Sequence, residues 1–406
     1  MRCRHCSVPL THTFIDLGFS PPSNAYLTAA QLAQPEQYFP LKVKVCDNCW
    51  LVQTEDYAKA DALFSADYAY FSSTSKTWLA HAAAYSQMIR QNLSLDHHSY
   101  VIEIAANDGY LLKNFITAGI DCLGIEPTAS TAKVAEENGI PIIQEFFGQR
   151  LAQQLLTQGK LADLIIGNNV YAHVPDINDF TRGLKTLLAP NGTITLEFPH
   201  LLHLIAECQF DTIYHEHFSY LSLHVVNRIF SLHGLQIYAV EQLTTHGGSL
   251  RIYGCHAGVK QLEASVQKML QLEQEHGLLN LASYECFQQR ANLIKYELLR
   301  FLLDCKRDNK KVGAYGAAAK GNTLLNVAGI KSDLLPFVVD AAPSKQGNYL
   351  PGSHIPIFSP DYLHSCSLDY LLILPWNIAH EIKEKLSGIV GGNTRFVTFI
   401  PKLTID

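Results

Sequence analysis

The sequence predicts an α/β protein made of a small N-terminal metal-binding lobe and two larger domains, each built on a doubly wound parallel sheet. Three observations lead to this prediction. Two C-x-x-C motifs lie near the N-terminus, strands alternate with helices over residues 100–198, and a second alternation follows over residues 311–374. Polar residues stand at the carboxyl ends of the expected strands, where parallel sheets bind their ligands.

Length and composition exclude several classes of protein. A chain of 406 residues, 48% hydrophobic and 17% charged, fits a globular protein of two or three domains. A net charge of −6 without a Lys/Arg run argues against a nucleic-acid partner. The sequence shows no apolar signal region and no run of about 18 apolar residues, so we expect no membrane partner. Ten scattered cysteines do not suit a disulfide framework, which favours a reducing, cytoplasmic location.

Four N-terminal cysteines have the spacing of a zinc site. Cys3 and Cys6 form one C-x-x-C motif, Cys46 and Cys49 form the other, and four thiolates complete a tetrahedral Zn²⁺ site. Prolines in the long intervening segment indicate an inserted loop. Because a closed four-sulfur site leaves no position for substrate, we interpret the zinc as structural. Unrelated cysteines are the alternative.

The segment over residues 61–77 combines aromatic residues, among them Tyr68, with a run of hydroxyl residues. Apolar residues then recur at helical spacing over residues 76–92, which predicts a helix covering the next domain. Core packing is the alternative role for the aromatic residues.

The first strand of the central domain leads into a turn that suits a ligand. Glu103, Ala105, Asn107 and Gly109 follow the E/D-x-G-x-G-x-G pattern, with two glycines replaced by other small residues. Such a turn, followed by a helix from about residue 110, brings backbone amides and a helix N-terminus up to a ligand. The strands expected in this domain cover residues 100–104, 121–125, the segment before residue 145, 161–166 and 193–198.

The ends of the later strands carry residues that suit a nucleoside. Glu126 ends the second strand, where a carboxylate meets the two ribose hydroxyls. Phe146 and Phe147 follow the third strand and are placed to flank an adenine ring. Asn168 follows the fourth strand at the same edge of the sheet.

The turn favours S-adenosylmethionine over a dinucleotide. NAD-binding turns need glycine where the pyrophosphate presses on the backbone, and Ala105 and Asn107 stand in this turn instead. S-adenosylmethionine has no pyrophosphate and tolerates the replacement better. Methyl transfer is therefore favoured over hydride transfer, with a dehydrogenase as the alternative.

Residues 212–223 hold the densest group of proton-handling side chains. Tyr214, His215, Glu216 and His217 stand in one unbroken run, and bulky apolar residues follow at once. With an unperturbed pKa near 6.5, a histidine at the edge of a core can act as a base at neutral pH. An ordinary polar turn and a metal site are the alternatives.

A second nucleotide-binding pattern occupies the end of the chain. Arg251, after a glycine turn, is a candidate anion contact or part of a structural hairpin. A helix around residues 287–301 is expected to link two domains without chemistry of its own.

The small-residue turn over residues 316–321 then predicts an anion cradle that includes Lys320, although its order is not that of a P-loop. A fold without a ligand is the alternative.

Taken in order, these pieces resemble one family over essentially the whole chain: the zinc-containing, S-adenosylmethionine-dependent C-methyltransferases of nucleotide-linked deoxysugars. The resemblance is carried by the four cysteines and by residues 103–109, 168–173, 214–217, 246–251, 313–321 and 346–352. It implies a zinc lobe over residues 1–65, a class I methyltransferase domain over 66–255, and linker helices with a C-terminal Rossmann-like sugar-nucleotide domain over 256–406.

The resemblance also implies roles for single residues. His217 matches the base proposed for the family, and Tyr214, Glu216 and His173 match the residues around the sugar. We assign to S-adenosylmethionine the residues Tyr68, Glu103, Ala105, Asn107, Gly109, Glu126, Phe146, Phe147 and Asn168. We assign to the substrate the residues Arg251, Tyr315, Lys320, Asp340 and Lys345.

The expected reaction is methylation of a carbon next to the keto group of a nucleoside-diphosphate 4-keto-6-deoxy sugar. We expect C-3 over C-5, a dTDP-linked substrate, and a monomer or small homo-oligomer. His217 would remove the proton alpha to the carbonyl, Glu216 would orient an imidazole or raise its basicity, and Tyr214 and His173 would hydrogen-bond the enolate oxygen. The rivals are an O- or N-methyltransferase, an NAD-dependent sugar-nucleotide oxidoreductase, and a non-catalytic zinc-ribbon protein.

Overall fold

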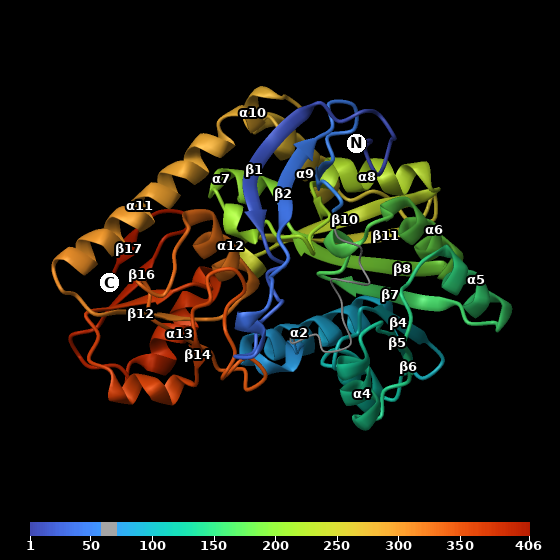
Figure 1. Cartoon of the computed structure of the whole chain (residues 1–406). Coiled ribbons are helices and arrows are strands. Elements are labelled where there is room, and N and C mark those ends of the chain that lie inside the picture. Colours follow the sequence, from blue (N-terminus) through green and yellow to red (C-terminus); the bar gives the residue numbers. More distant parts are fainter. Residues whose placement is uncertain (58–70) are drawn as a thin grey trace.

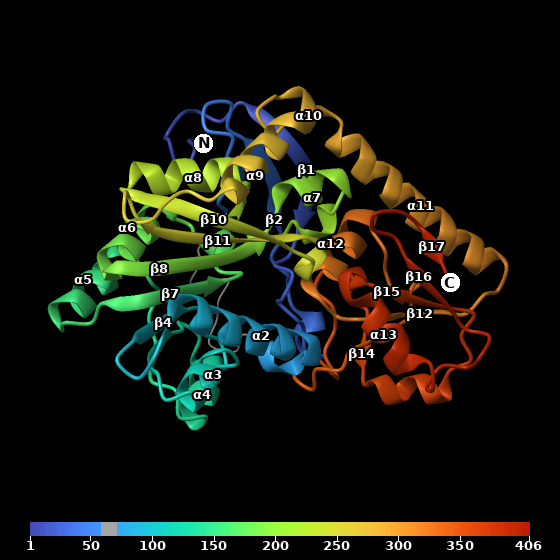
Figure 2. The same ribbon diagram turned by 180° about the vertical axis from the view of Figure 1, so that it is seen from behind.

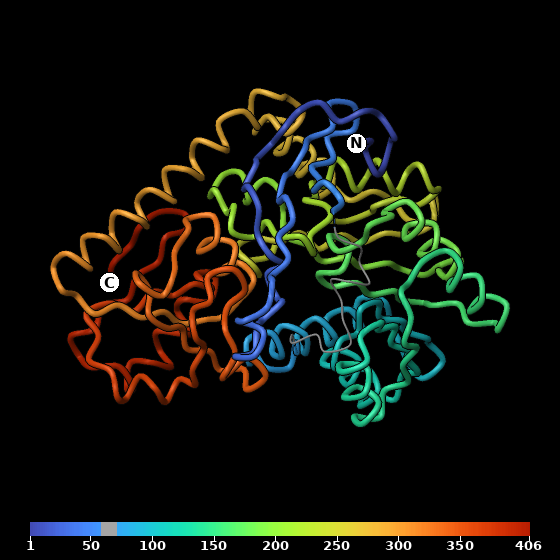
Figure 3. Tube along the Cα trace, viewed as in Figure 1, coloured from blue at the N-terminus to red at the C-terminus, as the bar shows by residue number. Residues whose placement is uncertain are grey.

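The computed structural model describes residues 1–57 and 71–406 and contains three sheets. Figure 1 shows the sheets in three neighbouring lobes, with the long strands of the N-terminal lobe running between the two larger ones. The Cα trace in Figure 3 starts in the N-terminal lobe and ends in the C-terminal lobe. No helix in the described ranges is both long and apolar enough to span a bilayer.

The N-terminal sheet is antiparallel and takes its last strand from far along the chain. It consists of β1 (His12–Ser20), β2 (Phe39–Val45), β3 (Val52–Thr54) and β9 (Ser219–Tyr220), in that order. In the last pair, Val52 lies opposite Tyr220. Because β9 directly follows the 214–217 run, the N-terminal lobe holds that run in place.

The central sheet has seven strands and confirms the doubly wound prediction. The strands predicted over residues 100–104 and 121–125 have those bounds in the structure. Across the sheet the order is β10-β11-β8-β7-β4-β5-β6, and β11 is antiparallel to both of its neighbours. The strands are β4 (Tyr100–Ile104), β5 (Asp121–Ile125), β6 (Ile142–Ile143), β7 (Ala162–Asn168), β8 (Leu188–Pro199), β10 (Leu235–Leu243) and β11 (Ser249–His256).

Helices cover the central sheet, and one of them reaches the C-terminal lobe. The helix predicted over residues 76–92 is α2 (Lys76–Leu93), which buries Ala82, Tyr85 and Ile89. Figure 2 shows α2 extending below the sheet toward the C-terminal lobe, where Thr77 Oγ1 donates to Glu381 Oε2 at 2.8 Å. The other helices of this domain are α3 (Leu112–Thr117), α4 (Ala129–Glu137), α5 (Gln149–Thr157), α6 (Ile177–Leu187), α7 (Leu201–Ala206) and α8 (Leu223–Leu232).

The linker is helical, as predicted. Helix α11 (Phe287–Arg307) follows α9 (Ala264–Glu275) and α10 (Ala282–Glu285) and runs along the outer side of the C-terminal lobe (Figure 1). Its buried stripe includes the predicted positions Phe287, Ala291, Ile294 and Leu298. These side chains belong to the same hydrophobic core as β1 and β12, so the helix joins the N-terminal and C-terminal lobes.

The C-terminal sheet has the Rossmann-like architecture that the sequence predicts for the end of the chain. Its order is β14-β13-β12-β15-β16-β17, parallel except for the last strand. Numbered within the domain this is 3-2-1-4-5-6, the order of dinucleotide-binding sheets. The elements are β12 (Val312–Tyr315), α12 (Ala319–Ala328), β13 (Val338–Val339), β14 (Ile357–Phe358), β15 (Tyr370–Ile373), α13 (Ala379–Leu386), β16 (Arg395–Thr398) and β17 (Thr404–Ile405).

Candidate active site

A cavity of about 510 Å³ lies where the carboxyl ends of both parallel sheets meet. It is lined from β4, β5, β7 and the segment after β6 on the central side, and from the start of α12 on the other. The position agrees with the rule that open α/β sheets bind ligands at the point where the strand order reverses, here between β4 and β7. The site residues named from the sequence that line it are Ala105, Asn107, Glu126, Phe146, Phe147, Asn168, His173, Tyr214, Glu216, His217, Lys320 and Lys345.

Five other residues named from the sequence do not line the cavity. Gly109 packs below the loop, where a Cβ atom would lie 2.0 Å from Ile140 Cδ1. Tyr315 is buried in a hydrophobic cluster of the C-terminal domain. The Asp340 carboxylate does not line the cavity but accepts hydrogen bonds from the backbone N–H groups of Ala317 and Ala342. Glu103 and Arg251 are described below, and Tyr68 lies outside the described residues.

The turn after β4 keeps a glycine-like backbone at the two positions where other residues replace the glycines of the pattern. Ala105 has φ 58° and Asn107 has φ 50°, both in the left-handed region. Asparagine tolerates this region, whereas alanine adopts it at a cost of about 1–2 kcal/mol. The backbone N–H of Asn107 donates to Glu126 Oε2 at 2.9 Å, which joins the turn to the end of β5. The two replacements therefore leave the shape of the cofactor turn intact.

Two buried polar side chains at this edge have no protein partner among the described residues. Both side-chain atoms of Asn168 are unpaired, and the residue is 9% exposed and lines the cavity. Both carboxylate oxygens of Glu103 are unpaired below the turn, and burial raises the pKa of Glu103 well above its ordinary value. Native proteins rarely leave such groups unsatisfied, so the Asn168 side chain, which lines the cavity, fits a ligand with hydrogen-bonding groups. Phe146 and Phe147 add an aromatic wall, and the set fits S-adenosylmethionine.

The 214–217 run divides its side chains between two surroundings. Its backbone forms a turn in which the amide of His217 donates to Tyr214 O at 3.0 Å. Tyr214, Glu216 and His217 line the cavity, whereas His215 points to the N-terminal lobe, with Nε2 3.2 Å from Pro40 O. The Tyr214 ring lies 3.9 Å from the His217 ring between centroids. The turn thus directs only one of its two histidines into the site.

Backbone carbonyls fix which nitrogen of each cavity histidine carries the proton. His217 Nδ1 lies 2.8 Å from Thr212 O, and His173 Nδ1 lies 2.8 Å from Glu216 O. A carbonyl oxygen only accepts, so each Nδ1 is an N–H donor and each neutral ring keeps its lone pair on Nε2. Burial lowers the pKa of His217 well below its ordinary value and lowers that of His173 to about 4. Both rings are therefore neutral at pH 7.

This geometry changes two roles expected from the sequence. Neutral His173 already gives its N–H to a backbone carbonyl, so it has no second N–H for an enolate oxygen. The side-chain carboxylate of Glu216 accepts from Asn24 Nδ2, which lies 2.8 Å from each of its oxygens. The backbone carbonyl of Glu216 orients the ring of His173. Asn24 lies in the loop after β1 and also lines the cavity. Sequence reasoning missed it, because no local pattern signals a contact between segments so far apart.

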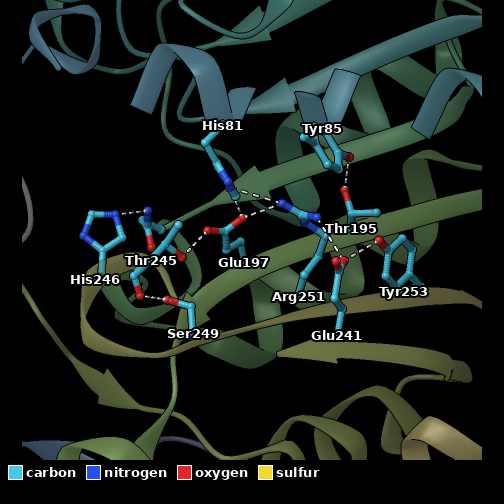
Figure 4. Close-up of polar contacts among 11 residues, drawn as sticks. His81, Tyr85, Thr195, Glu197, Glu241, Thr245, His246, Ser249, Arg251 and Tyr253 are labelled. Atoms are coloured by element: carbon cyan, nitrogen blue, oxygen red, sulfur yellow. Dashed lines mark hydrogen bonds and ion pairs between the residues drawn. The ribbon is translucent and has the colours of Figure 1, made fainter. Parts of the chain in front are cut away.

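Arg251 is held by carboxylates away from the cavity lining. Its guanidinium donates to Glu197 Oε2 and Glu241 Oε2, each at 3.0 Å, and stacks over the ring of Tyr85 (Figure 4). His81 Nε2 lies 2.9 Å from the same oxygen of Glu197. Burial alone would raise the pKa of Glu197, but His81 and Arg251 together hold it below its ordinary value. Arg251, expected from the sequence to contact the substrate, thus does not line the cavity, and its charge is paired with Glu197 and Glu241.

Lys320 has the opposite surroundings. It lies in the cavity wall at the start of α12, donates to Asn377 Oδ1 at 2.6 Å and stacks on Trp376. In the described part of the chain no carboxylate forms a salt bridge with it. Burial lowers its pKa, and Asp211 opposes this from a distance. Lys345, also in the wall, lies 3.6 Å from Asp340 and donates to Ala317 O. Among the described residues, Lys320 is thus a cavity-lining cation without a carboxylate partner, unlike Lys345.

The four cysteines form a compact tetrad. All four sulfurs lie within 4.8 Å of one another, with Cys3–Cys49 and Cys6–Cys46 Sγ separations of 3.5 Å. Gln53 Nε2 donates to Cys3 Sγ at 3.2 Å, a contact that suits a thiolate ligand. The donor set and its size fit tetrahedral Zn²⁺ with Zn–S bonds of about 2.3 Å. Because the cysteines do not line the cavity, the zinc is structural.

The sheet order and the site together define a class I methyltransferase. Numbered within the domain, the central strands follow 3-2-1-4-5-7-6 with strand 7 antiparallel. Three family models match: "Putative zinc binding domain" at residues 3–64, "Methyltransferase domain" at 78–240 and "C-methyltransferase C-terminal domain" at 244–401. The chain is 32% identical over 401 residues to the C-methyltransferase NovU of Streptomyces niveus, covering 98% of this chain and 95% of that protein. The chain belongs to this family of S-adenosylmethionine-dependent C-methyltransferases.

The solved structures found by comparison are more distant relatives. Magnesium protoporphyrin IX methyltransferase of Synechocystis PCC 6803 with bound SAM is 15% identical, with a TM-score of 0.33, covering 45% of this chain and 79% of that one. An S-adenosylmethionine-dependent methyltransferase of Clostridium acetobutylicum is 9% identical, with a TM-score of 0.37, covering 44% and 92%. Likenesses this weak do not bear on the present site.

Proposed function

We propose that the enzyme methylates a carbon alpha to the keto group of a nucleoside-diphosphate 4-keto-6-deoxy sugar. One observation carries the proposal: His217 lines a cavity as a neutral imidazole whose lone pair is on Nε2. A carbon acceptor needs a base that removes a C–H proton, and a neutral imidazole can do so at pH 7. S-adenosylmethionine, bound near Asn168, supplies an electrophilic methyl group.

The reaction balances with these residues. His217 Nε2 takes the alpha proton, the C–H electrons form a C=C bond, and the carbonyl π electrons move to oxygen. The enolate carbon then bonds to the methyl carbon while the methyl–sulfur bond breaks, so the keto group reforms. The imidazolium afterwards loses its proton to solvent. In this proposal Tyr214, whose ring packs against His217, contacts the sugar, and Glu216 with Asn24 forms part of the same cavity wall.

The nucleotide diphosphate fits the C-terminal side of the cavity. Lys320 offers an ammonium without a paired carboxylate, at the start of a ten-residue helix whose N-terminus favours anions. Ala318 and Ala319 also line the wall, and their small side chains let phosphate oxygens approach. We expect a dTDP-linked substrate and methylation at C-3 rather than C-5.

Deuterium exchange tests the proposal. A dTDP-4-keto-6-deoxyhexose incubated with the enzyme in heavy water should gain deuterium at the alpha carbon, and His217→Ala should lower this rate by about 10²–10⁴-fold. His215→Asn is the matched control, because this neighbouring histidine points away from the cavity; it should keep the rate within a few-fold. A wild-type enzyme that methylates the sugar nucleotide without exchange would instead favour O- or N-methylation.

A further inference from the structure

Residues 245–248 form a strained turn that brings a third histidine to the cavity. His246 has φ 53° and ψ 23°, so its backbone lies in the left-handed region, which residues other than glycine seldom adopt. The two glycines after it are tightly enclosed: a Cβ on Gly247 would lie 2.5 Å from Trp376, and one on Gly248 would lie 2.5 Å from His203. Strain of this kind persists only where the surroundings enforce it, and it concentrates at functional sites.

Hydrogen bonds around Glu197 hold the 245–248 turn in its strained conformation. Thr245 Oγ1 donates to Glu197 Oε1 at 2.8 Å, while Arg251 and His81 hold the other oxygen (Figure 4). Ser249 Oγ also donates to Thr245 O at 2.9 Å. The carboxylate of Glu197, fully buried on β8, therefore fixes the residue that precedes His246.

The ring of His246 has the same Nδ1–H tautomer as the other two cavity histidines, but the protein engages its other nitrogen, Nε2 instead of Nδ1. Asn169 Nδ2 lies 3.0 Å from His246 Nε2, and as an amide donor it places the lone pair on Nε2 and the proton on Nδ1. Burial, and then the charge of Lys320, lower the pKa of His246 to about 4, so the ring is neutral. His217 thus offers an acceptor to the cavity and His246 offers an N–H donor.

We propose that His246 Nδ1–H donates a hydrogen bond to the carbonyl oxygen of the ketosugar and stabilises the enolate that His217 forms. This inference rests on the proposed function. Both side chains line the same cavity. An enolate needs a donor at its oxygen, and neutral His173 cannot serve because its N–H is given to Glu216 O. A neutral N–H donor also leaves the lone pair of His217 available.

The test compares His246→Ala with His246→Asn. The asparagine amide nitrogen occupies about the position of Nδ1, and asparagine tolerates a left-handed backbone. His246→Ala should slow alpha-deuterium exchange of a dTDP-4-keto-6-deoxyhexose by about 100-fold, the usual effect of losing one such donor, while S-adenosylmethionine affinity changes less than about threefold. His246→Asn should recover the rate to within about tenfold of wild type. Exposed His276→Ala is the control.

Asn169→Asp tests the tautomer itself. A carboxylate would accept a proton from Nε2 and leave the lone pair on Nδ1, so exchange should slow although His246 is still present. Unchanged exchange in His246→Ala, equal loss in the alanine and asparagine variants, or loss confined to S-adenosylmethionine affinity would each overturn the proposal. Wild-type enzyme without any exchange would instead refute the enolate reaction, so the two failures are distinguishable.

Discussion

The Glu197–Arg251 cluster and the cavity edge both hold buried charged and polar groups. Among the residues that the structure describes, these groups are paired with each other in the cluster, whereas some of them lack such partners at the cavity edge. In the cluster, every charge has a partner of opposite sign and the residues stand on regular strands and a helix. At the cavity edge, Lys320 lacks a carboxylate and Asn168 lacks any protein partner within the described ranges. Four non-glycine residues with positive φ also line the cavity, namely Ala105, Asn107, Asn169 and His246. Paired groups stabilise the fold, whereas unpaired groups and strained backbone mark the place of a ligand.

The largest effect should come from unpairing the cluster. Arg251→Met leaves Glu197 buried with one cation fewer, and such a change costs about 3–5 kcal/mol of the free energy of unfolding. Denaturant unfolding measures this loss, while KM for the sugar nucleotide should change little in the folded variant. Combining it with Glu197→Gln removes both charges and should recover much of the stability. A raised KM at unchanged stability would move Arg251 into the substrate site.

The same comparison predicts the reverse result for Lys320. Lys320→Met removes a partly buried charge that has no carboxylate partner, so the free energy of unfolding should stay constant or rise. A hydrogen bond to a charged group contributes about 1.5–3 kcal/mol, so KM for the sugar nucleotide should rise by about 10- to 150-fold. Exposed Lys133→Met is the control for a lost positive charge. Loss of stability without a change in KM would make Lys320 structural.

Local patterns predicted the elements better than they predicted the pairing of charges. The strands at residues 100–104 and 121–125 could be placed because apolar, β-branched runs end at turn residues. Arg251 and Lys320 looked alike in the sequence, as cations beside glycine-rich turns. What separates them is Glu197 and Glu241, which come from strands adjacent to β11 only in the folded sheet. The split of His215 from His217 likewise depends on the N-terminal lobe, which no short segment encodes.

The pH dependence of kcat/KM tests whether burial at the cavity edge keeps His217 neutral. Burial lowers the pKa of His217 well below 6.5, and the base must be neutral to act. The value of kcat/KM, which reports the free enzyme, should therefore stay level as pH falls through 6.5 and decline only in more acidic solution. Below that break it should fall tenfold per pH unit. An acidic limb that already begins at or above pH 6.5 would show that another group controls the reaction.

The smallest effect concerns the backbone strain that separates the cavity edge from the cluster. Ala105→Gly should relieve about 1–2 kcal/mol of left-handed strain and lose about 0.5–1 kcal/mol to the greater freedom of unfolded glycine, a net gain of about 0.5–1 kcal/mol in the free energy of unfolding. Ala106→Gly, one residue on, is the matched control, because Ala106 is buried without positive φ and its replacement should destabilise the fold. Equal losses in both variants would mean that the turn stores no strain at Ala105. A stabilised Ala105→Gly enzyme with weaker S-adenosylmethionine binding would show that the methyl group of Ala105 contacts the cofactor, so the strain would serve binding.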